Sequence, residues 1–144
     1  MRPLFTIGYE AATLDDLIGR LKAAGVEVVI DVRAIAASRR AGFSKTVLGN
    51  SLAAEGIDYV HLRALGTPKA GREAARKGHI AEMHEIFEGQ LAEPQAQLDL
   101  IKAGDIAAGR KAALLCFEAD ACGCHRAVVA QRLGERIPFE IVDL

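Results

Sequence analysis

Long apolar runs are absent from this 144-residue chain. No stretch approaches the roughly 20 apolar residues that a helix needs to cross a bilayer, so we expect no membrane span. The N-terminus, MRPLFTIGYE, is too short an apolar stretch for a signal peptide and has no small-residue cleavage pattern. We therefore expect a cytoplasmic protein whose thiols are mostly reduced.

Cysteine is scarce, with three residues in the chain, and this odd number argues against a disulfide framework. All three cysteines and one of the four histidines lie between positions 116 and 125. This crowding favours local chemistry over a structural crosslink. A net charge of −1 gives the chain no overall attraction to nucleic acid or to membranes, and no internal repeat is visible.

Charge is nevertheless distributed unevenly along the chain. Between positions 33 and 77, nine basic residues stand against three acidic ones, which leaves +6. Positions 80 to 105 hold six acidic residues against Lys102 alone. We therefore expect one cationic side and one anionic side. The nine basic residues are Arg33, Arg39, Arg40, Lys45, Arg63, Lys69, Arg72, Arg76 and Lys77.

The order of periodic segments predicts an α/β fold, with a single domain and a mostly parallel five-stranded sheet flanked by helices. Thr13 with Asp16 predicts a capping box, and Ser44 predicts a second helix N-cap. The glycine-punctuated segment 65–79 predicts a long loop with one helical turn near 73–77. Strands are expected at 4–8, 26–32, 57–62, 111–117 and 138–144, and helices at 13–24, 44–55, 80–90, 94–108 and 124–136.

Polar side chains follow four of the expected strands. Ligands of such sheets bind beyond the carboxyl ends of the strands, so we expect these side chains to meet at one crevice. The alternative for each residue taken singly is that any strand must end in something polar. The residues are Gly8, Tyr9 and Glu10 after the first strand, Asp31 and Arg33 after the second, His61 and Arg63 after the third, and Cys116 and Glu118 after the fourth.

The segment LLCFEADACGCHRAVVAQRL, residues 114–133, allows a metal site, a reactive-thiol site or a chance cluster. Cysteine and histidine are the usual zinc ligands, but the spacing C-x5-C-x-C-H crowds them into one turn and argues against zinc. Cys124 is expected at a helix N-terminus beside His125 and Arg126, which favours a thiolate or a bound anion. Cys116 could be a nucleophile, a resolving thiol or a small buried apolar residue. Because position 122 is Cys and Arg126 lies ten positions after Cys116, the phosphatase-type loop is absent.

Two carboxylates have alternative roles in this pattern. Glu118 could act as a general base oriented by His125 or Arg126, or could pair with Arg126 to fix the turn. Asp31 and Arg33 lie on the same face of an extended segment. They could form an internal ion pair or present a carboxylate and a guanidinium to a ligand.

The segments TIGYE, VIDVR with the following SR and FSK, IDYVHLRALG and LLCFEADACGCHR resemble the family named domain of unknown function 488. Its most specific element is the C-x-E with a following C-H-R. The resemblance implies a compact α/β domain and an enzymatic role for the motif residues. Ala36 and Thr67 depart from the family's usual proline and glycine, and Cys122 is an additional cysteine. The motif residues are Asp31, Arg33, Ser38, Arg39, Phe43, Ser44, Tyr59, Leu65, Gly66, Cys116, Glu118, Cys124, His125 and Arg126.

We therefore predict an enzyme that binds an anionic small molecule or nucleotide in a cationic crevice, without a cofactor or a metal ion. The alternative is a non-catalytic module that binds nucleic acid or a partner protein through the basic stretch, and a third possibility is a purely structural cysteine segment. Phe43 and Tyr59 are the only aromatics of the basic stretch, which argues against base stacking. The expected catalytic residues are Cys116, Glu118, Cys124, His125 and Asp31, and the expected ligand-binding residues are Arg33, Ser38, Arg39, Ser44, Arg63, Arg126 and Tyr9.

Overall fold

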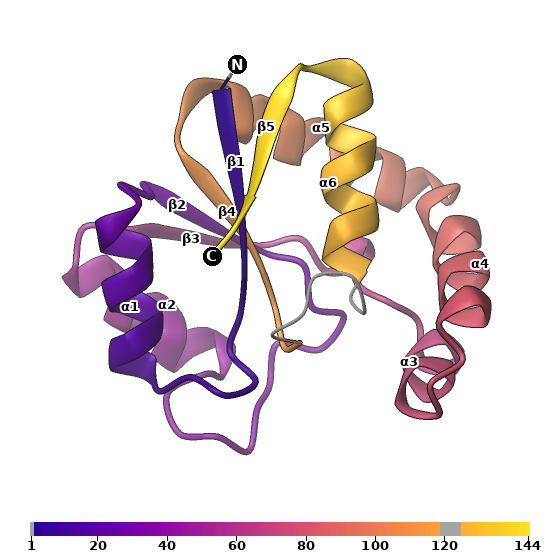
Figure 1. The fold of residues 1–144 in the computed structure, drawn as a ribbon, viewed down its shortest axis with the longest axis horizontal. Coiled ribbons are helices and arrows are strands. Elements are labelled where there is room, and N and C mark those ends of the chain that lie inside the picture. The colour runs from indigo at the N-terminus through magenta and orange to yellow at the C-terminus, as the bar shows by residue number, and fades with distance from the viewer. Residues whose placement is uncertain (1, 119–124) are drawn as a thin grey trace.

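The computed structural model describes residues 2–118 and 125–144. Five strands form one parallel sheet in the order β3-β2-β4-β1-β5, with helices on both faces (Figure 1). The predicted α/β fold with a five-stranded sheet is therefore confirmed. The strands are β1 (Arg2–Gly8), β2 (Val28–Asp31), β3 (Asp58–His61), β4 (Ala112–Cys116) and β5 (Phe139–Asp143).

The α-helices follow the predicted order, with one additional α-helix at Lys69–Arg76. Within the described ranges, none of them combines the length and apolarity that a membrane crossing requires. They are α1 (Leu14–Ala23), α2 (Lys45–Ala54), α3 (Lys69–Arg76), α4 (Ile80–Leu91), α5 (Pro94–Gly109) and α6 (His125–Arg136), with a short 3-10 helix η1 (Arg63–Leu65) after β3.

Two apolar cores lie on opposite faces of the sheet. α1 and α2 cover one face, where Leu17 and Leu48 are buried, and α3 to α6 lie on the other, where Phe87 is buried (Figure 1). Val29 and Ile30, which are neighbours on β2, belong to different cores because side chains alternate along a strand. Burial on both faces explains the continuous apolar run of this strand in the sequence.

α1 begins at the capping box that the sequence predicts. Thr13 Oγ1 accepts a hydrogen bond from the backbone N–H of Asp16 at 3.1 Å, and the backbone N–H of Thr13 donates to Asp16 Oδ2 at 3.5 Å. These bonds satisfy two backbone donors and fix where the chain turns from β1 into the helix.

The segment 65–79 is not the long loop that the sequence predicts, because Lys69–Arg76 forms α3. Glycine in a helix interior is unfavourable, and the punctuation by Gly66, Pro68, Gly71 and Gly78 predicts a loop. A Cβ atom at Gly71 would lie 2.4 Å from Thr67 Cγ2 and 3.4 Å from Ile86 Cγ2 of α4. The missing side chain lets α3 pack closely against α4, and this packing outweighs the low helix propensity.

Ser44 occupies the N-cap position of α2, but its side chain does not make the predicted cap hydrogen bond. Instead, Ser44 Oγ accepts from the backbone N–H of Ser38 at 3.0 Å and donates to the carbonyl oxygen of Ser38 at 3.2 Å. The hydroxyl therefore closes the loop between β2 and α2 rather than capping the helix.

The parallel register brings the carboxyl ends of four strands to one edge of the sheet. Gly8 of β1 pairs with Cys116 of β4, while Asp31 of β2 pairs with Leu115 of β4 and with His61 of β3. The turns that follow these strands therefore start from adjacent points.

Candidate functional site

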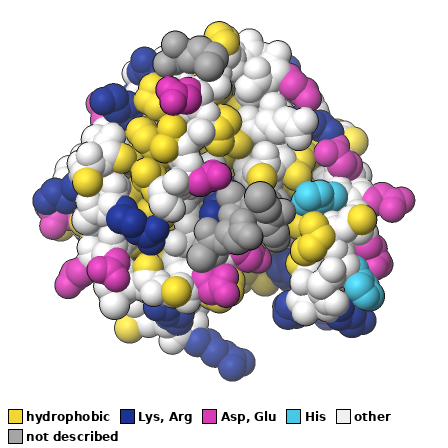
Figure 2. Space-filling view, viewed as in Figure 1, with side chains coloured by type: hydrophobic (Ala, Val, Ile, Leu, Met, Phe, Trp, Pro, Cys, Tyr) yellow, Lys and Arg dark blue, Asp and Glu magenta, His cyan; other side chains and the backbone are white. Residues whose placement is uncertain are grey.

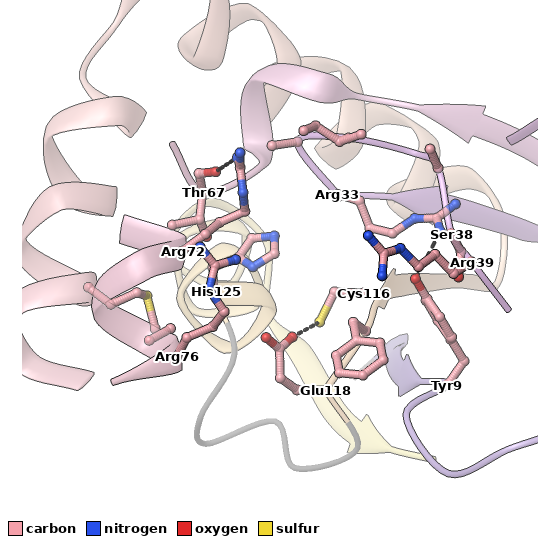
Figure 3. A pocket seen from close by; sticks show the side chains of 16 residues that line it. Tyr9, Arg33, Ser38, Arg39, Thr67, Arg72, Arg76, Cys116, Glu118 and His125 are labelled. Carbon is pink, nitrogen blue, oxygen red and sulfur yellow. Dashed lines mark hydrogen bonds between the residues drawn. The ribbon is translucent and has the colours of Figure 1, made fainter. Parts of the chain in front are cut away.

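A cavity of about 500 Å³ lies beyond these strand ends (Figure 3). This volume is in the range of small-molecule pockets. The walls come from the turns after β1 and β4, the loop after β2, α3, α4 and the start of α6. The lining residues are Tyr9, Arg33, Ala34, Ile35, Ala37, Ser38, Arg39, Thr67, Arg72, Ala75, Arg76, Met83, Cys116, Phe117, Glu118 and His125.

Arginines of α3 form one cationic wall of the cavity. Arg72 and Arg76 are one helical turn apart, and Arg72 Nη1 donates to the carbonyl oxygen of Thr67 at 2.8 Å. Figure 2 shows Lys and Arg side chains gathered over this helix at the lower right. Within residues 2–118 and 125–144, no carboxylate forms an ion pair with Arg39, Arg72 or Arg76. The positive charge of these three side chains is therefore not neutralised by a described acid.

The opposite wall contains a buried ion pair between Asp31 and Arg33. Arg33 Nη2 donates to Asp31 Oδ2 at 2.7 Å, and Arg33 Nε donates to Asp31 Oδ1 at 2.9 Å. The hydroxyl of Tyr59 also donates to Asp31 Oδ2. Asp31 is 0% exposed, so its carboxylate is not presented to the cavity. Of the two alternatives for the D-x-R pattern, the internal ion pair is the one that forms.

Asp31 also shifts the pKa values of Arg33 and Tyr59. Burial by itself lowers the pKa of Arg33. The hydrogen bonds and the charge of Asp31 raise this pKa by more than burial lowers it, so the net pKa lies above its usual range. Burial, with the hydrogen bond to Asp31, raises the pKa of Tyr59 above its ordinary value. At neutral pH the carboxylate and the guanidinium cancel, and Arg33 adds little net charge to the cavity.

The remaining donors of Arg33 fix the aromatic side of the cavity. Arg33 Nη1 donates to the hydroxyl of Tyr9 at 3.1 Å and to the carbonyl oxygen of Phe43 at 2.7 Å. The rings of Tyr9 and Phe43 stack with centroids 4.5 Å apart. Arg33 thus connects the end of β2, the turn after β1 and the end of the following loop.

Arg40 holds that loop against the turn after β1. Its guanidinium donates to the carbonyl oxygens of Tyr9, of Ala12 and, at 2.8 Å, of Glu10. It also lies 5.3 Å from the ring centroid of Phe43, within the distance of a cation–π interaction. Arg39, the preceding residue, lines the cavity instead.

Cys116 and Glu118 lie between the two walls (Figure 3). Cys116 Sγ is 3.3 Å from Glu118 Oε2 and 3.1 Å from Arg126 Nη1. Arg126 Nη1 also donates to the carbonyl oxygen of Glu118, and Arg126 is 0% exposed. Arg126 therefore supports the turn after β4 from inside the protein. Cys116 is the only cysteine within the described residues, and it is disulfide-bonded, so the predicted reduced state is wrong for this thiol.

The surroundings of Glu118 shift the pKa of its carboxyl upward. Burial raises the pKa of Glu118, and the charge of Glu10 adds to this, while a backbone hydrogen bond and the charge of Arg126 partly oppose it. A raised pKa makes this carboxyl a weaker acid than an ordinary glutamate.

His125 is neutral in the cavity wall. Its Nε2 lies 2.6 Å from the carbonyl oxygen of Val32, and because a carbonyl only accepts, Nε2 carries the proton and Nδ1 is the acceptor nitrogen. Burial, with the charge of Arg126, lowers the pKa of His125 to about 4, against the opposing effects of the Val32 carbonyl and the charge of Asp31. The ring also packs edge-to-face on Phe87 with centroids 5.2 Å apart.

The chain matches the model of the family described as Domain of unknown function DUF488 over residues 13–133. It belongs to this family. Comparisons with curated proteins and with solved structures found no match. The predicted family is thus confirmed, while the name DUF488 specifies no reaction.

The DUF488 cavity unites residues from distant parts of the motif set. Arg33, from the segment after β2, and Cys116 and Glu118, from the segment after β4, line the same hollow, as the sequence predicts. In all, seven of the predicted site residues line it: Tyr9, Arg33, Ser38, Arg39, Cys116, Glu118 and His125.

Other predicted site residues lie elsewhere. Asp31 and Arg126 are buried behind the cavity, and Ser44 is engaged with the backbone of Ser38. Arg63 is exposed on η1 and does not line the cavity. Cys124, a predicted catalytic residue, lies outside the described residues, as does Cys122. Among the side chains that are described, no group of three His, Cys, Asp or Glu is arranged to hold a metal ion.

Sequence reasoning missed the α3 wall. The sequence places Arg72 and Arg76 in the basic stretch, but it predicts a loop there and marks neither residue as ligand-binding. Their spacing of four residues is the signal that could have placed both on one helix face. The apolar lining residues Ile35 and Phe117 carry no chemical motif, so only the structure identifies them.

Proposed function

We propose that the DUF488 cavity binds an anionic small molecule, nucleotides included, and that the protein is an enzyme in which Glu118 transfers a proton to or from this ligand. The observation that carries the proposal is the convergence of Arg39, Arg72 and Arg76 on one cavity without an acidic partner in the described part of the chain. Guanidinium groups are well suited to bind phosphate or carboxylate through paired hydrogen bonds.

The other titratable groups of the cavity do not cancel this charge. Arg33 and Asp31 neutralise each other, and His125 is neutral because its pKa is lowered to about 4. Glu118 is the described carboxylate of the lining, and its raised pKa reduces the fraction that is ionised. The balance supports an anionic ligand, whose charge would in turn lie beside a carboxyl able to donate or accept a proton.

Thiol chemistry is a second part of the proposal. The buried guanidinium of Arg126, 3.1 Å from Cys116 Sγ, would stabilise a Cys116 thiolate. Because Cys116 is disulfide-bonded, it would act only after a thiol reductant has supplied two electrons and two protons to the disulfide. The catalytic role of the Cys124 thiol stays a prediction. A cytoplasmic location of the protein also stays a prediction.

The position of the cations favours a small molecule over nucleic acid. Arg72 and Arg76 line the cavity, whereas Lys69 and Lys77, at the two ends of the same helix, are exposed and do not line it. A phosphate backbone tracking the surface would use the lysines as well as the arginines. A small anion inside the cavity would use the arginines alone.

The test is calorimetric titration of the protein with inorganic phosphate. The pair Arg72→Gln with Arg76→Gln should weaken binding by about 100-fold, since each charged hydrogen-bond pair contributes about 1.5–3 kcal/mol. The matched pair Lys69→Gln with Lys77→Gln removes the same charge from α3 and should change binding by no more than about twofold.

Three results would contradict the proposal. Equal weakening by both pairs would indicate a surface effect, and salt-sensitive binding of DNA or RNA that both pairs weaken would establish the nucleic-acid alternative. Retention of phosphate binding without Arg72 and Arg76 would remove the anion site from this cavity. The proton-transfer role predicts in addition that Glu118→Gln retains phosphate binding and loses the pH dependence that a titrating carboxyl confers on it.

A further inference from the structure

We infer that the ligand is a phosphate monoester that carries a flat ring, with its phosphate on Arg72 and Arg76 and its ring against Phe117 and Ile35. This inference rests on the proposed function and names the substrate class of the same cavity. A nucleoside monophosphate is one such molecule. The inference depends on apolar side chains of the cavity, which play no part in the argument for anion binding.

The anionic end of the ligand is assigned to α3. Arg72 is held in place by its hydrogen bond to Thr67 O at 2.8 Å, so less side-chain freedom is lost when it binds a ligand. Arg76 lies on the same face one turn later and also lines the cavity. Two neighbouring guanidinium groups match the charge of a phosphate monoester better than that of a single carboxylate.

The apolar end is assigned to the rim formed by the loop after β2 and the turn after β4. Ile35 is 60% exposed and Phe117 is 43% exposed, although both are large apolar side chains. Of the six large apolar side chains that are exposed in the described part of the chain, these two line the cavity. The six are Ile35, Val47, Leu98, Ile101, Phe117 and Ile141.

A ring fits this rim better than a flexible alkyl group does. Phe117 packs edge-to-face on Tyr9 with centroids 5.4 Å apart, and Tyr9 in turn stacks on Phe43. The aromatic rim is thus supported by packing and by the hydrogen bond from Arg33 to Tyr9. Aromatic side chains held in this way stack on planar rings, and base–aromatic stacking contributes about 1–3 kcal/mol.

Figure 3 shows how the two ends are arranged. Arg72, Arg76 and Thr67 lie on one side of the cavity, Tyr9 and Arg33 lie on the other, and Cys116 and Glu118 lie between them. A ligand that reaches from the arginines to the aromatic side therefore passes the carboxyl of Glu118. The part of the ligand that lies beside Glu118 is therefore the part between the phosphate and the ring.

The test compares four probes by calorimetry on the full chain: inorganic phosphate, phenyl phosphate, AMP and adenosine. Phenyl phosphate and AMP should each bind about tenfold or more tightly than inorganic phosphate, and AMP should bind about 100-fold more tightly than adenosine. Phe117→Ser should remove most of the advantage of phenyl phosphate over phosphate while leaving phosphate binding unchanged. Leu98→Ser, at an exposed apolar residue of α5 outside the cavity, is the matched control and should change neither affinity.

The outcomes separate this inference from the proposed function. If phosphate binds through Arg72 and Arg76 but phenyl phosphate and AMP bind no better than phosphate, the ring subsite is wrong and the anion site stands. If adenosine binds as tightly as AMP, the assignment of the phosphate to α3 is wrong. If none of the phosphate-bearing probes binds, both the inference and the proposed function fail.

Discussion

A Cβ atom at Gly8 would lie 1.7 Å from the carbonyl oxygen of Glu118 and 2.9 Å from Arg126 Nη1. The two turns are also joined by a hydrogen bond from the backbone N–H of Tyr9 to the carbonyl oxygen of Phe117, at 3.1 Å. The turn after β1 therefore touches the backbone of the turn after β4, and a residue without a side chain is needed at the contact. The position of Glu118 in the cavity depends on this contact.

Gly8→Ala should destabilise the protein and weaken phosphate binding together. The added methyl group must push the Glu118 backbone away, and overpacking of this kind costs about 1–3 kcal/mol. Urea unfolding measures the loss. Gly19→Ala is the control, because a Cβ there has no neighbour within 4 Å, and it should be neutral or stabilise α1 by up to about 1 kcal/mol. Equal stability of the two variants would show that the turns do not meet as described.

Asp31→Asn should be among the most destabilising single substitutions in the protein. It leaves the guanidinium of Arg33 buried without its counter-charge, and breaking a buried pair costs about 3–5 kcal/mol. Glu55→Gln is the comparison, since Glu55 pairs with Lys22 on the surface at 3.0 Å and such pairs contribute about 0–1 kcal/mol. Chemical denaturation of both variants checks this, and a loss at Asp31 no larger than that at Glu55 would contradict a buried, paired carboxylate.

Arg39 and Arg40 are adjacent in sequence and should respond oppositely to substitution. Arg40→Gln removes charged hydrogen bonds to the carbonyl oxygens of Tyr9, Glu10 and Ala12, so it should lower stability by about 2 kcal/mol or more. Arg39→Gln removes a cavity-lining cation and should weaken phosphate binding about fivefold or more with little change in stability. Unfolding and titration of both variants give the comparison. A stability loss at Arg39 as large as at Arg40 would show that Arg39 belongs to the scaffold.

His125 should make the protein less stable as the pH falls from about 6.5 to about 4. Its pKa is about 4 in the folded protein and near 6.5 when exposed, so the unfolded chain binds more protons in that window. This contribution is fully present above the unfolded pKa and is lost as the pH falls toward 4, by up to about 3 kcal/mol. Below about pH 4 the loss should level off, because both states are then protonated.

The variant His125→Gln isolates this effect. The difference in unfolding free energy between wild type and His125→Gln should shrink as the pH falls through the same window. The exposed residue His79 provides the control, and His79→Gln should follow the wild-type profile. Parallel profiles for wild type and His125→Gln would contradict a buried, neutral imidazole bonded to Val32.

Much of the fold could be predicted because the strands and helices carry strong local patterns. β2 is continuously apolar because it is buried on both faces, and α1 has a complete capping box. The sequence does not predict α3, because Gly71 and Pro68 are typical of loops. Its helix depends on close packing against Ile86 of α4, and a contact between two elements leaves no signal within either one.

The candidate site could be predicted in its location but not in the state of its groups. The carboxyl ends of parallel strands must meet, so the joining of Arg33 with Cys116 and Glu118 in one cavity follows from topology. Topology does not determine whether the Asp31 carboxylate faces the ligand or pairs with an arginine. Asp31 turns inward to Arg33 and Tyr59, and this choice depends on the pairing of β2 with β3 rather than on local sequence.

The most direct measurement of the central claim is a crystal structure of the protein with selenate, an anion that can be located by its anomalous scattering. The claim is that the arginines of α3 and the strand-end turns form one anion site. It predicts an anomalous peak inside the cavity, within hydrogen-bond distance of the guanidinium groups of Arg72 and Arg76. An empty cavity with peaks only at exterior lysines such as Lys69 and Lys77 would contradict it.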